Sequence, residues 1–315
     1  MMDKNINITE INKPILFFLV GLPASGKTQQ AHILKERFNA AIHSSDEIRS
    51  ELFNNVSNQQ ENGLVFETLH KRVIHDLQSG KNAVFDATNI SYKRRIHFLN
   101  KIAKIECQKV CIVMATPFEV CVKRNESRNN WVPKDVLERM YKSIWMPGYY
   151  EGWDYIELIY PDNYVSKGVV ELFNGKSGLN FVEQDNHHHN FTVGHHCVVT
   201  YALVGDVNKE LQEAALLHDI GKPYTKSFIN SRGEATDTAH YYNHHHVSAY
   251  DSLFYSEPDC NRLYVANIIQ FHMKPFEIER SPNPFKATEK FKALVGAQLY
   301  KDVMLLHRAD VLAKG

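Results

Sequence analysis

Several features that would place this chain outside the cytosol are missing from its sequence. Its five cysteines are odd in number and form no CxxC pair, which argues against a disulfide framework and favours reduced thiols in the cytoplasm. No apolar run approaches about 20 residues, and the polar start MMDKNINITE carries no secretory signal, so we expect no membrane partner. The formal net charge is zero, so any contact with nucleic acid must be local. Internal repeats and low-complexity tracts are absent, and the sequence leaves the oligomeric state open.

A phosphate-binding loop is the first positive signal. Residues 14–38 read PILFFLVGLPASGKTQQAHILKERF, which is an apolar strand, a glycine-rich loop and an amphipathic helix. The loop matches the pattern GxxxxGK[ST], whose backbone N–H groups, lysine and hydroxyl together hold nucleotide phosphates and Mg²⁺. We expect ATP or another NTP to bind here with Mg²⁺, with Lys27 as a catalytic residue and Thr28 as a metal ligand. The residues expected to bind the nucleotide are Gly21, Ser25, Gly26, Lys27 and Thr28.

Strands and helices alternate after this loop. The segments are AAIHSS, a helix from Asp46, KNAVFDAT, a helix around RRIHFLNKIA, and KVCIVMAT. This alternation predicts an α/β domain in which helices cover a parallel sheet. A guanine-binding NKxD motif is absent, which argues against a GTPase.

Charged residues follow the predicted strands where a phosphate acceptor could bind. Asp46, in SSDEIR, could take the proton of an acceptor hydroxyl, and Arg49 lies three residues on along the same helix face. A plain helix N-cap is the alternative role for Asp46. Asp86 ends a buried strand, where it serves either an acceptor pocket or a simple turn. Arg124 and Arg128 lie four apart, hence on one helical face, which forms either a lid over phosphates or a solvated basic face.

Residues 14–150 resemble the kinase domain of phage-type 5′-polynucleotide kinases. The resemblance rests on GLPASGKT, on SSDEIR, on DATN followed by YKRR, and on VKRNESR leading into VPKDVLERMYKSI. It implies that Asp46 is the general base for the 5′-hydroxyl and that Arg49 binds the 3′-side phosphate of the acceptor. Asp86 would help to build the acceptor pocket. Glu47 stands where a second aspartate is common in that family.

The same resemblance assigns the two arginines of VKRNESR. It implies that Arg128, together with Arg124, acts as a lid arginine on the transferring phosphoryl group and helps to bind the nucleotide. An arginine in such a role is worth about 10³–10⁵ in rate in related chemistry. The alternative for this half of the chain is a kinase acting on nucleotides or other small molecules.

The composition changes in the second half of the chain. We expect a kinase-like domain over 1–165, a connector over 166–186 with turn residues and short apolar pieces, and a second domain over 187–315. Twelve of the 17 histidines lie between His187 and His307. This second domain is predicted to be all-α, with helices over 193–206, 208–220, 244–255, 258–272 and 288–313.

A His-Asp pair within AALLHDIGKP is the main candidate for metal chemistry. His218 and Asp219 stand at the end of an apolar helix, where they could bind one divalent metal, and Lys222 is placed to meet a phosphate. Because a lone His-Asp pair occurs by chance, the assignment depends on further ligands. TVGHHCVVTYAL supplies a histidine on the preceding helix, and LLHRADVLAKG supplies Asp310 on the final one.

Residues 190–315 resemble the HD phosphohydrolase superfamily in LLHDIGK, in RADVLAKG and in the order of the ligands. The family's VxxH pattern, over residues 193–196, selects His196 as the first ligand. NHHHVSAY selects His244, and IIQFHMKP matches His272 to a histidine that binds a second metal. Phosphate contacts or a buried structural role are the alternatives for those two residues. The metal ligands implied are His196, His218, Asp219, His244, His272 and Asp310, with Asp219 also counted as catalytic.

The remaining histidines of DNHHHNFTVGHH are not assigned to the metal. His195 lies one helical step, about 100°, away from the ligand face. His187, His188 and His189 precede the helix at the expected mouth of the pocket, where they are either solvated or in contact with a substrate phosphate. The cluster is therefore neither a purification tag nor a five-ligand site.

The two halves together imply phosphate chemistry at nucleic-acid ends. Imidazole and carboxylate ligands suit one or two ions of Mn²⁺, Ni²⁺, Co²⁺, Fe²⁺ or Zn²⁺, which activate water for attack on phosphorus. We expect a bifunctional enzyme that phosphorylates 5′-OH ends of RNA or DNA and hydrolyses 3′-phosphate or 2′,3′-cyclic phosphate ends, with a separate ligase as partner. The alternatives are a nucleoside or nucleotide kinase fused to a nucleotidase, and a kinase carrying a non-catalytic metal-binding HD module.

Overall fold

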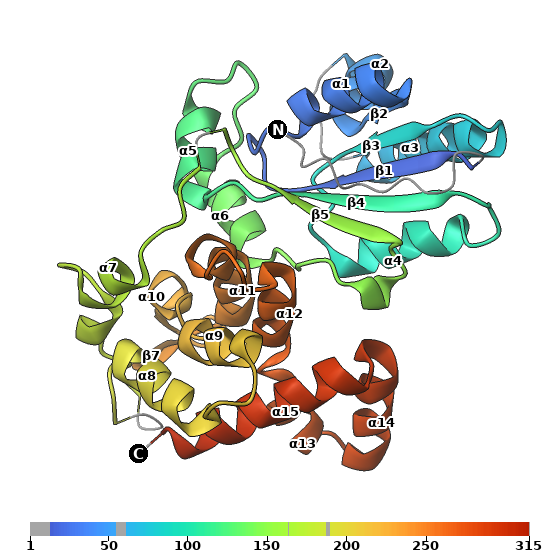
Figure 1. Ribbon diagram of the computed structural model, residues 1–315. Coiled ribbons are helices and arrows are strands. Elements are labelled where there is room, and N and C mark those ends of the chain that lie inside the picture. The colour runs from blue at the N-terminus through green and yellow to red at the C-terminus, as the bar shows by residue number, and fades with distance from the viewer. Residues whose placement is uncertain (1–12, 55–60, 163, 187–189, 315) are drawn as a thin grey trace. The chain divides into compact units, whose positions relative to one another are not determined.

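The computed structural model describes residues 13–54, 61–162, 164–186 and 190–314 (Figure 1). The chain divides into two compact units, which we treat separately. The N-terminal unit comprises Met1–Met140 and Pro147–Tyr164, and the C-terminal unit comprises Tyr141–Met146 and Val165–Gly315. No helix within the described residues is both long and apolar enough to cross a membrane.

A parallel sheet organises the described part of the N-terminal unit. Its strand order is β2-β3-β1-β4-β5, and every pairing is parallel. All six residues of β1 are buried, as expected for a central strand covered on both faces. The expected α/β fold is confirmed for this unit. The strands are β1 (Ile15–Val20), β2 (Ala41–Ser44), β3 (Ala83–Asp86), β4 (Gln108–Met114) and β5 (Tyr155–Ile159).

Alternate residues of β1 pack into different cores. Phe17 and Leu19 belong to the core that includes Leu34 of α1. Phe18 points to the other face, where its ring lies 4.5 Å from Phe85 and 5.1 Å from Trp153 between centroids. This period-2 burial fixes the register of the sheet, because a shift of one residue would exchange the two cores. The helices are α1 (Lys27–Phe38), α2 (Ser45–Phe53), α3 (Asn62–Gln78), α4 (Tyr92–Lys101), α5 (Phe118–Glu126), α6 (Lys134–Lys142), whose last two residues are assigned to the C-terminal unit, and the short η1 (Tyr149–Glu151).

A fully buried ion pair supports the loop that follows β3. Arg95 of α4 donates from Nε to Oε2 of Glu151 at 2.8 Å and from Nη2 to Oε1 at 2.7 Å, and both side chains are inaccessible. Its Nη1 also donates to the carbonyl of Asn89 at 2.9 Å, and the Asn89 amide donates to Leu19 O at 2.8 Å. Asn89 adopts a left-handed backbone conformation (φ 51°). These bonds fix the chain just beyond Asp86.

The described part of the C-terminal unit is mainly helical, as the sequence predicts. Its core includes Leu217 of α9, Val265 and Ile269 of α12, and Leu306 of α15, all of which are buried. A two-stranded antiparallel hairpin, β6 (Ser227–Ile229) with β7 (Ala235–His240), is an unanticipated addition. The helices are α7 (Val169–Asn174), η2 (Leu179–Phe181), α8 (Val193–Val204), α9 (Lys209–Leu217), α10 (Lys222–Thr225), α11 (His244–Tyr255), α12 (Arg262–Phe271), α13 (Lys274–Glu279), α14 (Pro284–Val295) and α15 (Ala297–Leu312).

The expected single helix over 288–313 is wrong. Gly296, with φ 83°, ends α14 and begins α15, so the segment forms two helices. Glycine tolerates this left-handed region because it has no Cβ. The helix expected over 258–272 begins only at Arg262, where Asn261 Oδ1 accepts a capping hydrogen bond from Tyr264 N at 3.1 Å.

Removing one partner of the buried ion pair is expected to destabilise the N-terminal unit. Glu151→Gln leaves the Arg95 charge buried without its carboxylate, and we expect the free energy of unfolding to fall by about 3–5 kcal/mol. Urea denaturation followed by tryptophan fluorescence measures this, because Trp153 Nε1 donates to Glu151 at 3.0 Å. Glu67→Gln, which breaks an exposed ion pair with Lys71, is the control and should cause no resolvable change. Equal effects of the two substitutions would contradict the prediction.

Candidate functional sites

The loop between β1 and α1 has the backbone of a phosphate-binding site. Gly26 has φ 100° and Ala24 has φ 61°, so the chain curls at two positions before α1 begins. A Cβ on Gly21 would lie 2.7 Å from Ser25 Oγ and 3.0 Å from Met114 Cβ, so the loop tolerates no side chain there. Within the described residues, the buried Ser25 Oγ has no hydrogen-bond partner. A bound phosphate would supply the acceptor that this hydroxyl lacks.

Lys27 is held against the same loop. Its Nζ donates to Leu22 O at 2.7 Å and to Gly21 O at 3.1 Å, and the side chain is buried. Burial lowers the pKa of this ammonium group, although the nearby Asp86 carboxylate acts in the opposite direction. A lysine whose charge is poorly solvated gains most from an anionic ligand, so the position suits nucleotide phosphates.

Thr28 and Asp86 meet at the carboxyl end of β3. Thr28 Oγ1 donates to Asp86 Oδ2 at 3.2 Å. Burial raises the pKa of Asp86, and Lys27 and Thr28 partly oppose that effect. A hydroxyl and a carboxylate are the oxygen ligands that Mg²⁺ takes beside nucleotide phosphates. The pair therefore fits Mg²⁺ held by Thr28, and it makes Asp86 a candidate for that role besides the acceptor pocket.

Asp46 and Arg49 form an ion pair at the start of α2. Arg49 Nη1 donates to Asp46 Oδ1 at 3.0 Å, and Arg49 Nη2 donates to Asn62 Oδ1 at 2.9 Å. The Arg49 side chain is buried, whereas 59% of the Asp46 side chain is exposed. The helix is capped by Ser44, whose Oγ accepts from Asp46 N at 3.3 Å. Because another residue provides the cap, the Asp46 carboxylate remains available to a ligand.

One cavity of about 1060 Å³ joins these groups. Among the described residues, those that line it include six basic side chains and only two carboxylates, Asp46 and Asp86, although the chain as a whole has no net charge. Such a local excess of positive charge attracts phosphates. Ligand pockets usually measure about 300–1,000 Å³, so this one has room for a nucleotide and part of a second ligand. The six basic residues are Lys27, Arg49, Arg94, Arg124, Arg128 and Arg139.

The shared helical face expected for Arg124 and Arg128 is wrong. Helix α5 ends at Glu126, so Arg128 lies beyond it, in a turn where its N–H bonds Asn125 O at 3.2 Å. Both arginines nevertheless line the cavity.

Five further residues of the cavity wall were not identified from the sequence. Of these, Asn62 and Phe66 come from α3, which no motif marks. Trp131, with 61% of its surface exposed, stands in the chain after α5. Arg94 and Arg139 lie within the YKRR and VPKDVLERMYKSI motifs but had no role assigned, and the other three residues match no motif, so only the folded structure brings the five to the site. The five are Asn62, Phe66, Arg94, Trp131 and Arg139.

Four histidines in the C-terminal unit present the same nitrogen to one centre. Each has a fixed ring orientation because its Nδ1 lies within hydrogen-bond distance of a backbone carbonyl, which turns Nε2 toward the centre. The Nδ1–O distances are 3.2 Å for His196 to Ala313, 2.8 Å for His218 to Ala215, 2.7 Å for His244 to Tyr241, and 2.6 Å for His272 to Ile269.

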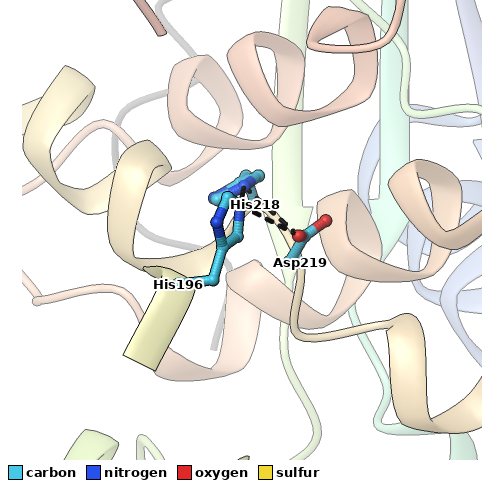
Figure 2. A group of neighbouring side chains, drawn as sticks. All are labelled: His196, His218 and Asp219. Carbon is cyan, nitrogen blue, oxygen red and sulfur yellow. Dashed lines mark hydrogen bonds and ion pairs between the residues drawn. The ribbon is translucent and has the colours of Figure 1, made fainter. Parts of the chain in front are cut away.

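Asp219 lies between two pairs of these imidazoles. Its Oδ2 is 3.5 Å from His196 Nε2 and 3.4 Å from His218 Nε2, and Figure 2 shows this group. Its Oδ1 is 3.2 Å from His244 Nε2 and 3.9 Å from His272 Nε2. The two oxygens of one carboxylate thus face two separate candidate metal positions, each with two histidines.

The chemistry of these donors fits divalent cations. His196 Nε2 lies 3.2 Å from His218 Nε2, and His244 Nε2 lies 3.1 Å from His272 Nε2. Two neutral imidazoles with protonated Nδ1 atoms cannot hydrogen-bond through Nε2, because both atoms are acceptors. Burial lowers the pKa of His218, and that of His272 to about 3, which favours the neutral form of both rings. A cation bound at each pair would satisfy these lone pairs.

Asp310 and Lys222 complete the surroundings of Asp219. Asp310 Oδ1 lies 3.1 Å from His196 Nε2 and 3.9 Å from His218 Nε2, so it belongs to the first position. Lys222 Nζ lies 2.6 Å from Asp219 Oδ2 and donates to Gln184 Oε1 at 2.7 Å. Burial opposes the ionisation of Asp219, but Lys222 and the histidines outweigh it and hold its pKa well below the ordinary value.

Among the other residues considered for this centre, His195 does not reach the metal positions, whereas Gln184 contacts one of its residues. His195 is exposed, with its ring 4.5 Å from Phe191, so it does not reach the metal positions. His187, His188 and His189 lie outside the described residues. Gln184, which is buried and bonds Lys222, was not identified from the sequence because no motif marks it.

Both halves of the chain match known domain families. Residues 16–147 match the family model described as an AAA domain, and residues 193–315 match the HD domain model. The chain therefore carries a P-loop kinase-type domain and an HD domain, as the sequence predicts.

Individual relatives are distant. An L-seryl-tRNA(Sec) kinase of Methanococcus maripaludis is 24% identical over 151 residues, which is 44% of this chain and 56% of the relative. The chain thus spans about half the length of this curated relative. A putative kinase from Chloroflexus aurantiacus is similar at 18% identity and a TM-score of 0.39, over 48% of this chain and 86% of that one. A chain of a Pnkp1/Rnl/Hen1 RNA repair complex is similar at 24% identity and a TM-score of 0.37, over 41% and 43%. At these TM-scores neither structure carries a functional argument.

The shared carboxylate predicts how metal is lost from variants of the C-terminal unit. We expect two divalent ions per chain in the wild type, one fewer in His196→Ala or His244→Ala, and loss of both in Asp219→Ala. Metal content after loading with Mn²⁺ or Ni²⁺ and dialysis measures this. His195→Ala is the matched control and should keep both ions. Metal loss from His195→Ala equal to that from His196→Ala would contradict the assignment.

Proposed function

We propose that this protein is a bifunctional enzyme that repairs nucleic-acid ends, most of all those of RNA. Its P-loop domain transfers the γ-phosphoryl group of ATP or another NTP to 5′-hydroxyl ends, and its HD domain hydrolyses 3′-phosphate or 2′,3′-cyclic phosphate ends. The observation that carries the proposal is the single cavity that connects the P-loop with the Asp46–Arg49 pair. That cavity offers both a donor site and a hydroxyl acceptor site with its own anion-binding group.

The contacts of these residues support the roles proposed for the kinase half. The exposed Asp46 carboxylate takes the proton of the 5′-hydroxyl, and Arg49 binds the phosphate on the 3′ side of that nucleotide. Lys27 and the P-loop N–H groups hold the β- and γ-phosphates. Arg124 and Arg128 neutralise charge on the phosphoryl group during transfer, since phosphoryl transfer is catalysed mainly by positioning and electrostatic stabilisation.

The HD half has a distinct centre. His196, His218 and Asp310 with Asp219 would hold one metal, and Asp219 with His244 and His272 would hold a second. When bound, such metals supply Lewis-acid activation of water and of the phosphoester. Lys222 stabilises the phosphate of the substrate, and Gln184 orients the Lys222 ammonium group.

The two activities complement each other. Breaks that leave 5′-OH and 3′-phosphate ends need both reactions before a ligase can join them, so we propose a separate ligase as the partner in that sequence. The name of the curated relative indicates that the acceptor of that enzyme is carried by an RNA. This supports RNA as the nucleic acid on which the present protein acts. The five free cysteines support a cytoplasmic location.

Transfer of labelled γ-phosphate from ATP to 5′-OH oligonucleotides of RNA and DNA tests the kinase half. We expect Asp46→Asn to slow transfer by about 10²–10⁴-fold, because the hydroxyl loses its general base. Lys35→Ala, an exposed lysine of α1, is the control and should leave the rate unchanged. Equal transfer to mononucleosides lacking a 3′-phosphate would favour nucleotide salvage instead.

Release of phosphate from 3′-phosphorylated and 2′,3′-cyclic oligonucleotides tests the HD half. With Mn²⁺ or Ni²⁺ present, we expect hydrolysis by the wild type and its loss in Asp219→Ala, since that substitution removes the carboxylate common to both metal positions. Asp237→Ala, an exposed carboxylate on β7, is the matched control. Metal binding by a wild type that hydrolyses none of these ends would identify the HD domain as a non-catalytic module.

A further inference from the structure

Two side chains on the cavity wall have no assigned role in the proposed phosphoryl transfer. Phe66 of α3 is half-buried, and Arg94 of α4 is exposed. The guanidinium carbon of Arg94 lies over the Phe66 ring, 5.4 Å from its centroid. Both line the cavity that contains Lys27 and Asp46. The contact holds a flexible, exposed arginine in place at the rim of a ligand site.

The position of this pair relative to Arg49 is set by one helix. Arg49 donates to Asn62, the first residue of α3, and Phe66 follows four residues later. Residues four apart lie on the same face of a helix, about one turn or 5–6 Å along its axis. The anion-binding guanidinium of Arg49 and the Phe66 ring therefore belong to neighbouring parts of one wall.

Flat surfaces of this kind recognise nucleobases. Bases that are not paired stack on aromatic rings and on the planes of arginine guanidinium groups, with little dependence on sequence. A sugar or an amino-acid acceptor has no flat π-face and gains little from such a wall. The Phe66–Arg94 pair thus adds to the cavity a feature that phosphate transfer alone does not need.

We propose that the Phe66–Arg94 pair is a stacking platform for the base of the acceptor nucleotide whose 3′-side phosphate is bound by Arg49. This inference rests on the proposed kinase function and specifies its substrate class. The acceptor is a nucleotide unit with an unpaired base at the 5′ end of a strand. The platform contacts the flat face of that base, so the binding affinity depends little on which base it is.

Direct binding tests the platform without relying on catalysis. Isothermal titration of the wild type with adenosine 3′-phosphate is compared with titration by the same sugar phosphate lacking the base. Stacking of one base changes affinity by about 5- to 150-fold. We expect the base-bearing ligand to bind tighter by a factor in that range.

Substitutions then locate the effect. Phe66→Leu keeps an apolar side chain but removes the ring, and Arg94→Ala changes an exposed residue with little risk to the fold. Each should lower affinity for the base-bearing ligand at least threefold more than affinity for the base-free ligand. Arg37→Ala is the matched control, because Arg37 lies over Phe38 at a similar 5.2 Å, away from the residues that line the cavity.

The possible outcomes separate this inference from the proposed function. Equal affinity of the wild type for both ligands, or equal losses for both ligands in Phe66→Leu and Arg94→Ala, would overturn the platform. Phosphorylation of 5′-OH ends measured on the same preparations decides the kinase function independently. Base-dependent binding without phosphorylation would contradict the kinase proposal but support the stacking platform.

Discussion

The buried carboxylate of Asp219 is the constraint on which the HD unit depends. Each of its oxygens faces a different pair of imidazoles, and Lys222 also contacts its Oδ2. A charge taken out of water is stable only when its surroundings compensate it, so the elements that carry these partners must pack in a specific way. The P-loop unit has a smaller counterpart in Asp86, which contacts Thr28 and lies near Lys27.

Local motifs made much of both sites predictable. The P-loop is a continuous segment whose spacing encodes its own geometry, and the adjacent His218 and Asp219 carry a recognisable signature. The HD ligands on other helices followed from a family resemblance, and the structure brings them together around Asp219. The strand and helix alternation likewise predicted a parallel sheet, because burial on both faces leaves long apolar strands such as β1.

The sequence could not predict features that exist only through tertiary contacts. Asn62 and Gln184 carry no motif, and each becomes significant because a distant basic side chain donates to it. The lid arginines were predicted on one helical face, but α5 ends before Arg128. The break at Gly296 was missed because apolar periodicity continues across it, and a single glycine inside a helical pattern is often tolerated.

The carbonyl contacts of the histidines bear on how the metal centre assembles. His218, His244 and His272 each use the carbonyl three residues earlier, so their rings are oriented by the local chain, which is a helix C-terminus for His218 and His272 and the turn before α11 for His244. The orientation of these three ligands is thus set by short-range contacts in the chain, and we expect ion binding to require little rearrangement of their rings. His196 differs, since its carbonyl partner is Ala313, 117 residues away. Through this contact, the affinity of the centre for metal should depend on the packing of α15 against α8.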